Sequence, residues 1–172
     1  SEKLLINRIN SELANDLGNL FQRVLSMLYK YFEGVLPDKN ELNNQDNYLL
    51  NLPYLTLETL DKHMNKLQFN LAIDAIWKIV KSANVYVDTS EPWKLFKEDK
   101  ERLKTVIYTL IVTIYKISIL VQPFLPNAAK NMLTQLKQKE YLNFDNIDNS
   151  LNSGLKLKKP IILFPKIIKD NL

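Results

Sequence analysis

Two residues with planar hydrogen-bonding side chains, Asn19 and Arg23, stand one helical turn apart in "NDLGNLFQR". An amide and a guanidinium present donors and acceptors in fixed geometry, which suits hydrogen bonding to the edge of a nucleobase. A solvent-exposed helix surface carries the same residue types. The spacing alone therefore leaves both interpretations open.

A third candidate is Trp93, which follows Pro92 directly in "DTSEPWKLFKED" and is one of only two tryptophans. Proline is well tolerated in the first turn of a helix, so Trp93 is expected near a helix start, where a large ring is hard to bury. Two interpretations are open: a core anchor, or a stacking platform for an unpaired base, which is worth about 1–3 kcal/mol. The other tryptophan, Trp77, lies on an apolar helical stripe and is expected in the core.

The sequence contains none of the motifs that mark common catalytic sites, such as a Gly-rich phosphate loop, G-x-S-x-G or H-E-x-x-H. It has no cysteine and a single histidine, His63, which excludes thiolate metal sites and leaves little scope for histidine ligands. The pair Glu58 and Asp61 is typical of a solvated helix face. We therefore expect no catalytic residue and no metal ligand in this chain.

Composition and charge are those of a folded soluble domain. The chain has 172 residues, of which 46% are apolar and 24% charged, and a net charge of +4 that favours polyanionic partners. No secretory signal opens it, and its most apolar run, Val106 to Val121, contains Lys116 and is shorter than a membrane span. We expect one domain over 1–172, a cytoplasmic location, no membrane contact, and a buried helix at this run.

Helical periodicity dominates the chain. A helix is predicted over 4–33, with apolar residues on one side and Asn19 and Arg23 on the other. The apolar side consists of Ile9, Leu13, Leu17, Leu20, Val24 and Leu28. Further helices are predicted over 56–67 with Thr56 as cap, 70–88 with Asn70 as cap, 91–121 with Ser90 as cap, and 127–138. Whether the part before Asp99 forms a separate short helix is open.

The remaining segments are expected to be irregular. The polar stretch up to Pro53 is predicted to be a loop, and 141–172 an extended tail, because Pro160 and Pro165 argue against helix there. The predicted fold class is all-α, a bundle of about five helices with an extended C-terminal tail.

Four segments, in order, resemble motifs of one family. "LANDLGNLFQRVLSMLYKYFEGVLP" resembles the first helix of the anticodon-binding domain of bacterial methionyl-tRNA synthetases, and "NVYVDTSEPWKLFKED" resembles its N-x-Y-[IV]-D-x-x-x-P-W-x-L-x-K motif. "VQPFLPNAA" is similar to its P-x-[LM]-P helix break. "KPIILFPKI" is similar to its closing K-P-x-x-L-F-P-R-I, with Lys166 in place of the arginine. The resemblance runs from about Asn10 to Ile168.

The resemblance implies a helical bundle of the class I synthetase type that reads the CAU anticodon. The family's reading residues fall on Asn19 and Arg23, which would hydrogen-bond to the first anticodon base, and on Trp93, which would stack on it. The family's HIGH-type and KMSKS-type catalytic signatures and its zinc-binding insertion are absent from this sequence. The resemblance therefore implies a C-terminal fragment of a methionine–tRNA ligase that binds tRNA but does not activate methionine.

Cofactors and partners follow from the same resemblance. The full-length enzyme would use ATP with magnesium, whereas no cofactor is expected in the fragment. The expected partners are the anticodon loop of tRNA(Met) and the missing catalytic domain of the same chain. Without an appended dimerisation domain, a monomer is expected.

Two alternatives stay open. One is the anticodon-binding domain of a related synthetase for isoleucine, valine, leucine or cysteine. The other is a helical protein–protein docking module in which Trp93 is an interface hot spot. RNA binding weakens steeply with salt and depends on anticodon sequence, whereas hydrophobic docking does neither.

Overall fold

The computed structural model describes residues 2–157 and 159, with the side chains of 6, 9, 10, 11 and 14 excepted. Residues 2–32 are helical throughout, as α1 (Glu2–Asn7), a π-helical turn η1 (Arg8–Leu13) and α2 (Ala14–Phe32). The other α-helices are α3 (Asn44–Asn65), α4 (Phe69–Ser90), α5 (Pro92–Glu98), α6 (Lys100–Leu120) and α7 (Pro126–Gln135). A 3₁₀ turn, η2, covers Phe144–Asp148. The predicted all-α fold class is confirmed.

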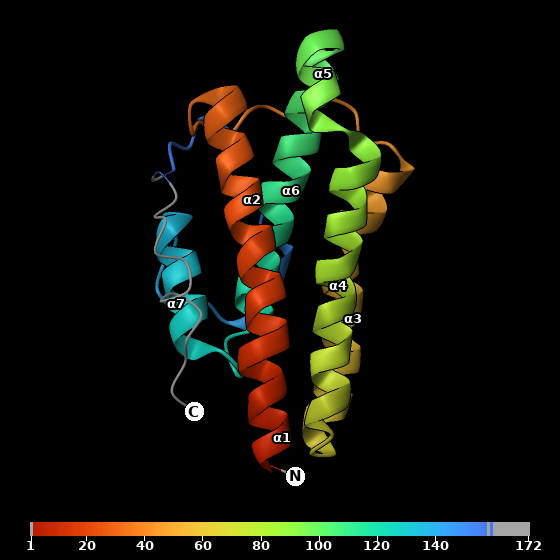
Figure 1. Cartoon of the computed structure of the whole chain (residues 1–172), viewed down its shortest axis with the longest axis vertical. Helices are drawn as coiled ribbons and strands as arrows, with labels where there is room; N and C mark the ends of the chain where they lie inside the picture. Colours follow the sequence, from red (N-terminus) through yellow and green to blue (C-terminus); the bar gives the residue numbers. More distant parts are fainter. Residues whose placement is uncertain (1, 158, 160–172) are drawn as a thin grey trace.

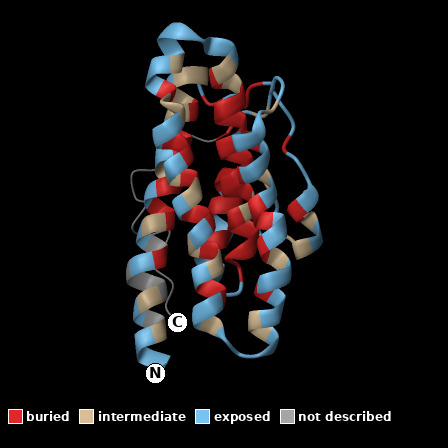
Figure 2. Cartoon of the chain, turned by 90° about the vertical axis from the view of Figure 1, so that its right-hand side faces the viewer, coloured by how far each residue is buried: buried red, intermediate tan, exposed pale blue. Residues whose placement is uncertain are grey.

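The helices form an elongated bundle around α6 (Figure 1). Helices α2 and α4 lie side by side in front of α6, α3 lies behind α4, and α5 forms one end of the bundle. Figure 2 shows the buried residues gathered between the helices, with the exposed residues on their outer sides. Burial in the outer helices thus follows the helical period.

Helix α6 is the centre of the core. By length and composition it is the one helix of the described residues suited to cross a membrane, yet 89% of that window is buried inside the bundle. Two of its buried hydroxyl groups have local partners, because Thr113 and Ser118 donate to the carbonyl oxygens of Thr109 and Ile114 at 2.7 Å. The prediction of a buried helix over this run is confirmed.

The first predicted helix has the expected two sides. The apolar stripe is buried at its described positions, which are Leu13, Leu17, Leu20, Val24 and Leu28, while the side chain of Ile9 lies outside the described residues. The helix ends at Glu33 and Gly34, both with positive φ, 55° and 82°. A β-carbon at Gly34 would lie 2.6 Å from the Tyr29 ring, so this turn needs glycine.

The prediction of a loop up to Pro53 is wrong, and the helix predicted over 56–67 is the second half of a longer helix, α3. Helix α3 begins at Asn44, with a capping box in which the Asn43 side chain accepts from the Asp46 amide at 2.9 Å and Asp46 accepts from the Asn43 amide at 3.0 Å. Pro53 lies inside the helix, and Thr56 is not a cap, because its buried hydroxyl donates to the carbonyl of Leu52.

Two further predicted caps are wrong. Asn70 lies in the first turn of α4, which begins at Phe69, and Ser90 is the last residue of that helix rather than the cap of the next. Glu91, with φ 48°, separates α4 from α5. The predicted helix over 91–121 is therefore two helices, and Asp99 caps the second by accepting from the Arg102 amide at 3.0 Å.

The described part of the predicted extended tail packs on this domain. The side-chain amide of Gln122 exchanges two hydrogen bonds with the backbone of Leu142, at 2.7 and 3.0 Å. Farther along, Lys156 forms an isolated bridge with Val35, and the Leu157 amide donates to the carbonyl of Gly34 at 2.9 Å. The closing motif, with Lys166, lies outside the described residues.

Candidate nucleic-acid interface

The polar face of α2 presents Asn19 and Arg23 to solvent, as predicted. The Asn19 side chain makes no hydrogen bond within the described part of the chain. Arg23 donates from Nη2 to Oδ1 of Asp88 on α4, at 3.1 Å. Both side chains of this pair are exposed, at 41% and 66%, so the pair orients the guanidinium more than it stabilises the fold.

Trp93 lies in the first turn of α5, and 47% of its surface is exposed. Pro92 before it is buried, and Glu91, in the left-handed conformation, separates α4 from α5. The ring is therefore accessible. This exposure does not fit the interpretation of Trp93 as a core anchor.

Two contacts hold the polar face of α2 beside the α4–α5 junction. The first is the ion pair between Arg23 and Asp88, which precedes Trp93 by five residues. The second is a ring contact between Tyr31 of α2 and Phe96 of α5, with centroids 5.0 Å apart. In the described part of the chain, Trp93 itself forms no hydrogen bond or ring contact with Asn19 or Arg23.

A buried polar network supports this end of the bundle. Asp46 is fully buried and accepts from both terminal nitrogens of Arg102, at 2.6 and 2.8 Å, and from the Tyr86 hydroxyl at 2.6 Å. Burial by itself would raise the pKa of Asp46, but the hydrogen bonds from Arg102, Tyr86 and the Asn43 backbone outweigh it and lower that pKa. Burial and the neighbouring Asp46 raise the pKa of Tyr86.

This network was missed in the sequence. Asp46 lies among asparagines and glutamine in a stretch expected to be a loop, where the spacing of Asn43 and Asp46 could have indicated a capping box but not the contact with Arg102. Tyr86 lies two residues before Asp88, so the network holds the part of α4 from which Asp88 reaches Arg23.

The prediction that Trp77 belongs to the core is confirmed only in part, because the residue packs against the core without being fully buried. The ring is partly buried, and its Nε1 donates to Oδ2 of Asp16 at 2.7 Å. The side chains of Arg8 and Lys81 lie over it, 5.5 and 5.0 Å from the ring centroid. Arg8 also pairs with Asp74, which ties the π-helical turn η1 to α4.

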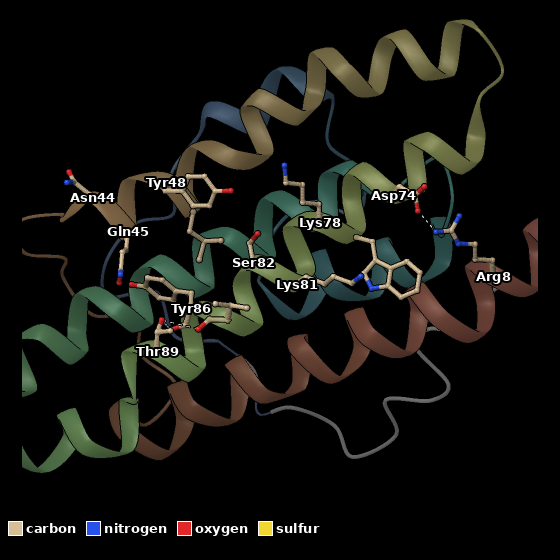
Figure 3. Close-up of a pocket in the computed structure, with 13 residues that line it drawn as sticks. Arg8, Asn44, Gln45, Tyr48, Asp74, Lys78, Lys81, Ser82, Tyr86 and Thr89 are labelled. Atoms are coloured by element: carbon tan, nitrogen blue, oxygen red, sulfur yellow. Dashed lines mark hydrogen bonds and ion pairs between the residues drawn. The ribbon is translucent and has the colours of Figure 1, made fainter.

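Trp77 borders a groove of about 720 Å³ between α3 and α4 (Figure 3). Its lining comes mainly from one side of α4 and the first turns of α3, and consists of Arg8, Asn44, Gln45, Tyr48, Leu49, Asp74, Trp77, Lys78, Lys81, Ser82, Val85, Tyr86 and Thr89.

Within the described residues, no group of three or more His, Asp or Glu side chains is arranged to hold a metal ion. The single histidine, His63, lies near the surface, with Nδ1 3.2 Å from Oε1 of Gln68.

Comparison with known proteins agrees with the motifs. Residues 36–172 match the family model of the anticodon binding domain of methionyl tRNA ligase. Methionine–tRNA ligase of Caldanaerobacter subterraneus subsp. tengcongensis is 43% identical over 171 residues, which cover 97% of this chain and 27% of that protein. The enzyme of Clostridium tetani is 37% identical over 97% of this chain and 26% of its own length.

The fold of this chain also matches that of a solved structure. The crystal structure of the apo form of Mycobacterium tuberculosis methionyl-tRNA synthetase matches with a TM-score of 0.85 and 34% identity, over 96% of this chain and 34% of that one. This chain therefore spans about a quarter to a third of the length of these relatives. Because the family model matches most of its residues, the chain belongs to the family of methionyl-tRNA ligase anticodon-binding domains.

Proposed function

We propose that this chain recognises the CAU anticodon of tRNA(Met) as the C-terminal part of a methionine–tRNA ligase. The remainder of that enzyme would attach methionine to the tRNA with ATP and magnesium. The observation that carries the proposal is the exposed ring of Trp93, five residues after the Asp88 that holds Arg23, in a chain of this family.

Each residue has a role that suits its chemistry. The Trp93 ring offers a face on which a splayed-out base can stack. Asn19 and Arg23 offer hydrogen bonds to the edge of the first anticodon base. A guanidinium has five N–H donors, and Asp88 takes up one nitrogen of Arg23, so donors remain for RNA.

Discrimination follows from the same groups. A base with the wrong donor and acceptor pattern would leave Asn19 or Arg23 desolvated and unpaired, which costs about 1–3 kcal/mol for each group. The net charge of +4 adds a favourable but unspecific attraction to the RNA backbone. Specificity would thus come from α2 and Trp93, and part of the affinity from the overall charge.

The proposal also includes the cellular location and the oligomeric state of the parent protein. We place the parent protein in the cytoplasm, as a monomer in which this bundle lies against the catalytic part. The described tail packs on this bundle through Gln122 and Val35, so that stretch does not depend on the catalytic part for its position.

The test is a titration of end-labelled anticodon stem-loops, followed by fluorescence anisotropy at low and moderate salt. The CAU stem-loop should bind more tightly than one with a changed first anticodon base. Trp93→Ala should weaken CAU binding about 5- to 150-fold, the equivalent of 1–3 kcal/mol. Arg23→Gln should abolish the difference between the two RNAs.

A matched control is Ser26→Ala, on the same exposed side of α2, which should change neither affinity. Equal binding of both RNAs, unaffected by Trp93→Ala, would overturn the proposal. Binding that is insensitive to salt and independent of the anticodon would instead favour the protein-docking alternative.

A further inference from the structure

The groove between α3 and α4 is separate from the residues assigned to anticodon reading. Its walls are largely apolar, and two of its hydrophobic side chains are unusually exposed, Tyr48 at 55% and Val85 at 60%. Its volume of about 720 Å³ lies in the range of ligand-binding clefts. Exposed apolar side chains that lie together mark a binding surface more often than single exposed apolar residues do.

The groove also carries two cations without acidic partners. Lys78 and Lys81 form no ion pair within the described part of the chain, and Lys81 instead lies over the Trp77 ring (Figure 3). The third cation, Arg8, is already engaged by Asp74 and Glu12. Free ammonium groups beside aromatic and apolar walls are what single-stranded nucleic acid requires, because its phosphates need cations and its bases need apolar faces.

The groove is continuous with the candidate anticodon site along α4. Lys81 and Asp88 are seven residues apart, which is two helical turns on the same side and about 10 Å along the axis. Thr89, beside Asp88, lines the far end of the groove. An RNA strand that leaves the Arg23–Asp88 region therefore meets Lys81 without crossing another element.

We propose that this groove binds the backbone of an unpaired RNA stretch next to the anticodon triplet, with phosphates at Lys78 and Lys81 and a base against Tyr48 and Val85. The proposal rests on the proposed function, since the same RNA would occupy both places. Phosphate contacts carry no base information. The groove should therefore raise the affinity for CAU and for changed anticodons by the same factor.

The test compares two double variants of equal charge in the stem-loop titration. Lys78→Gln/Lys81→Gln removes the groove cations, and Lys137→Gln/Lys139→Gln removes two lysines beyond the end of α7. Loss of two phosphate contacts lowers the slope of log affinity against log salt by about 1.4. Between 50 and 200 mM salt, the affinity of the wild type should therefore fall about sevenfold more than the affinity of the groove variant. The affinity of the control variant should fall as much as that of the wild type.

Trp77 gives a second measurement that does not depend on the lysines. In Trp93→Phe, which keeps an aromatic face for stacking, Trp77 is the only tryptophan and borders the groove. Its fluorescence should change on addition of the stem-loop, with the same midpoint as the anisotropy.

The outcomes separate the two proposals. An unchanged salt slope in the groove variant together with an unchanged Trp77 signal, while Trp93→Ala still loses binding, overturns the groove and leaves anticodon reading intact. If the wild type binds neither RNA, anticodon reading fails and the groove proposal falls with it. A groove variant that keeps RNA affinity but binds its own catalytic part less tightly would make the groove a protein interface, which also overturns the proposal.

Discussion

At the scale of single residues, the free energy of the bundle depends on one buried carboxylate. Asp46 is fully buried and holds Arg102 by two hydrogen bonds. We expect Asp46→Asn to lower the free energy of unfolding by about 3 kcal/mol, because it leaves a partly buried guanidinium without its counter-charge. Urea denaturation measures this change. Asp88→Asn, which breaks the exposed pair with Arg23, is the control and should cost less than about 1 kcal/mol. Similar losses in both variants would contradict the prediction.

At the scale of elements, the end of α2 depends on Gly34. Its φ of 82° disfavours any other residue, and a β-carbon there would lie 2.6 Å from the Tyr29 ring. Tyr29 donates to the carbonyl of Leu157 at 2.5 Å, so displacement of its ring also disturbs the tail. Gly154 has a similar φ of 84° but open space around it. Gly34→Ala should therefore destabilise clearly more than Gly154→Ala, which should cost about 1–2 kcal/mol. Thermal unfolding of the two variants tests this, and equal shifts would show that the contact with Tyr29 has no effect.

At the scale of the whole molecule, the Asp46 network joins α3, α4 and α6, so its protonation should affect the entire bundle. The pKa of Asp46 is lowered in the folded state. Its contribution to stability is therefore fully present above the ordinary carboxyl pKa of about 3.9 and is lost as the pH falls through the lower folded-state pKa. We expect the free energy of unfolding to fall below about pH 4, with a shallower fall in Asp46→Asn. Urea midpoints between pH 7 and pH 3 would show this, and parallel curves for the two proteins would contradict it.

The sequence by itself determined the features that depend on neighbours within one or two helical turns. The apolar stripe of α2 and the opposite face with Asn19 and Arg23 follow from the helical period, and the burial of α6 follows from its nearly unbroken apolar run. The place of Trp93 in the first turn of a helix follows from Pro92 before it, whereas the exposure of its ring does not. The ordered motifs determined the family.

Only the tertiary structure decided what lies between helices. Helix α3 begins at Asn44 through the local capping box of Asn43 and Asp46, but the pairing of Asp46 with Arg102, 56 residues away, follows from no local pattern. Trp77 packs at the edge of the core, where Asp16, 61 residues away, accepts its indole N–H. Likewise, only the packing of α2 against α4 brings Arg23 to Asp88, which is 65 residues away in the sequence. Helical spacing sets which way a side chain points from its own helix, but packing alone sets what it meets there.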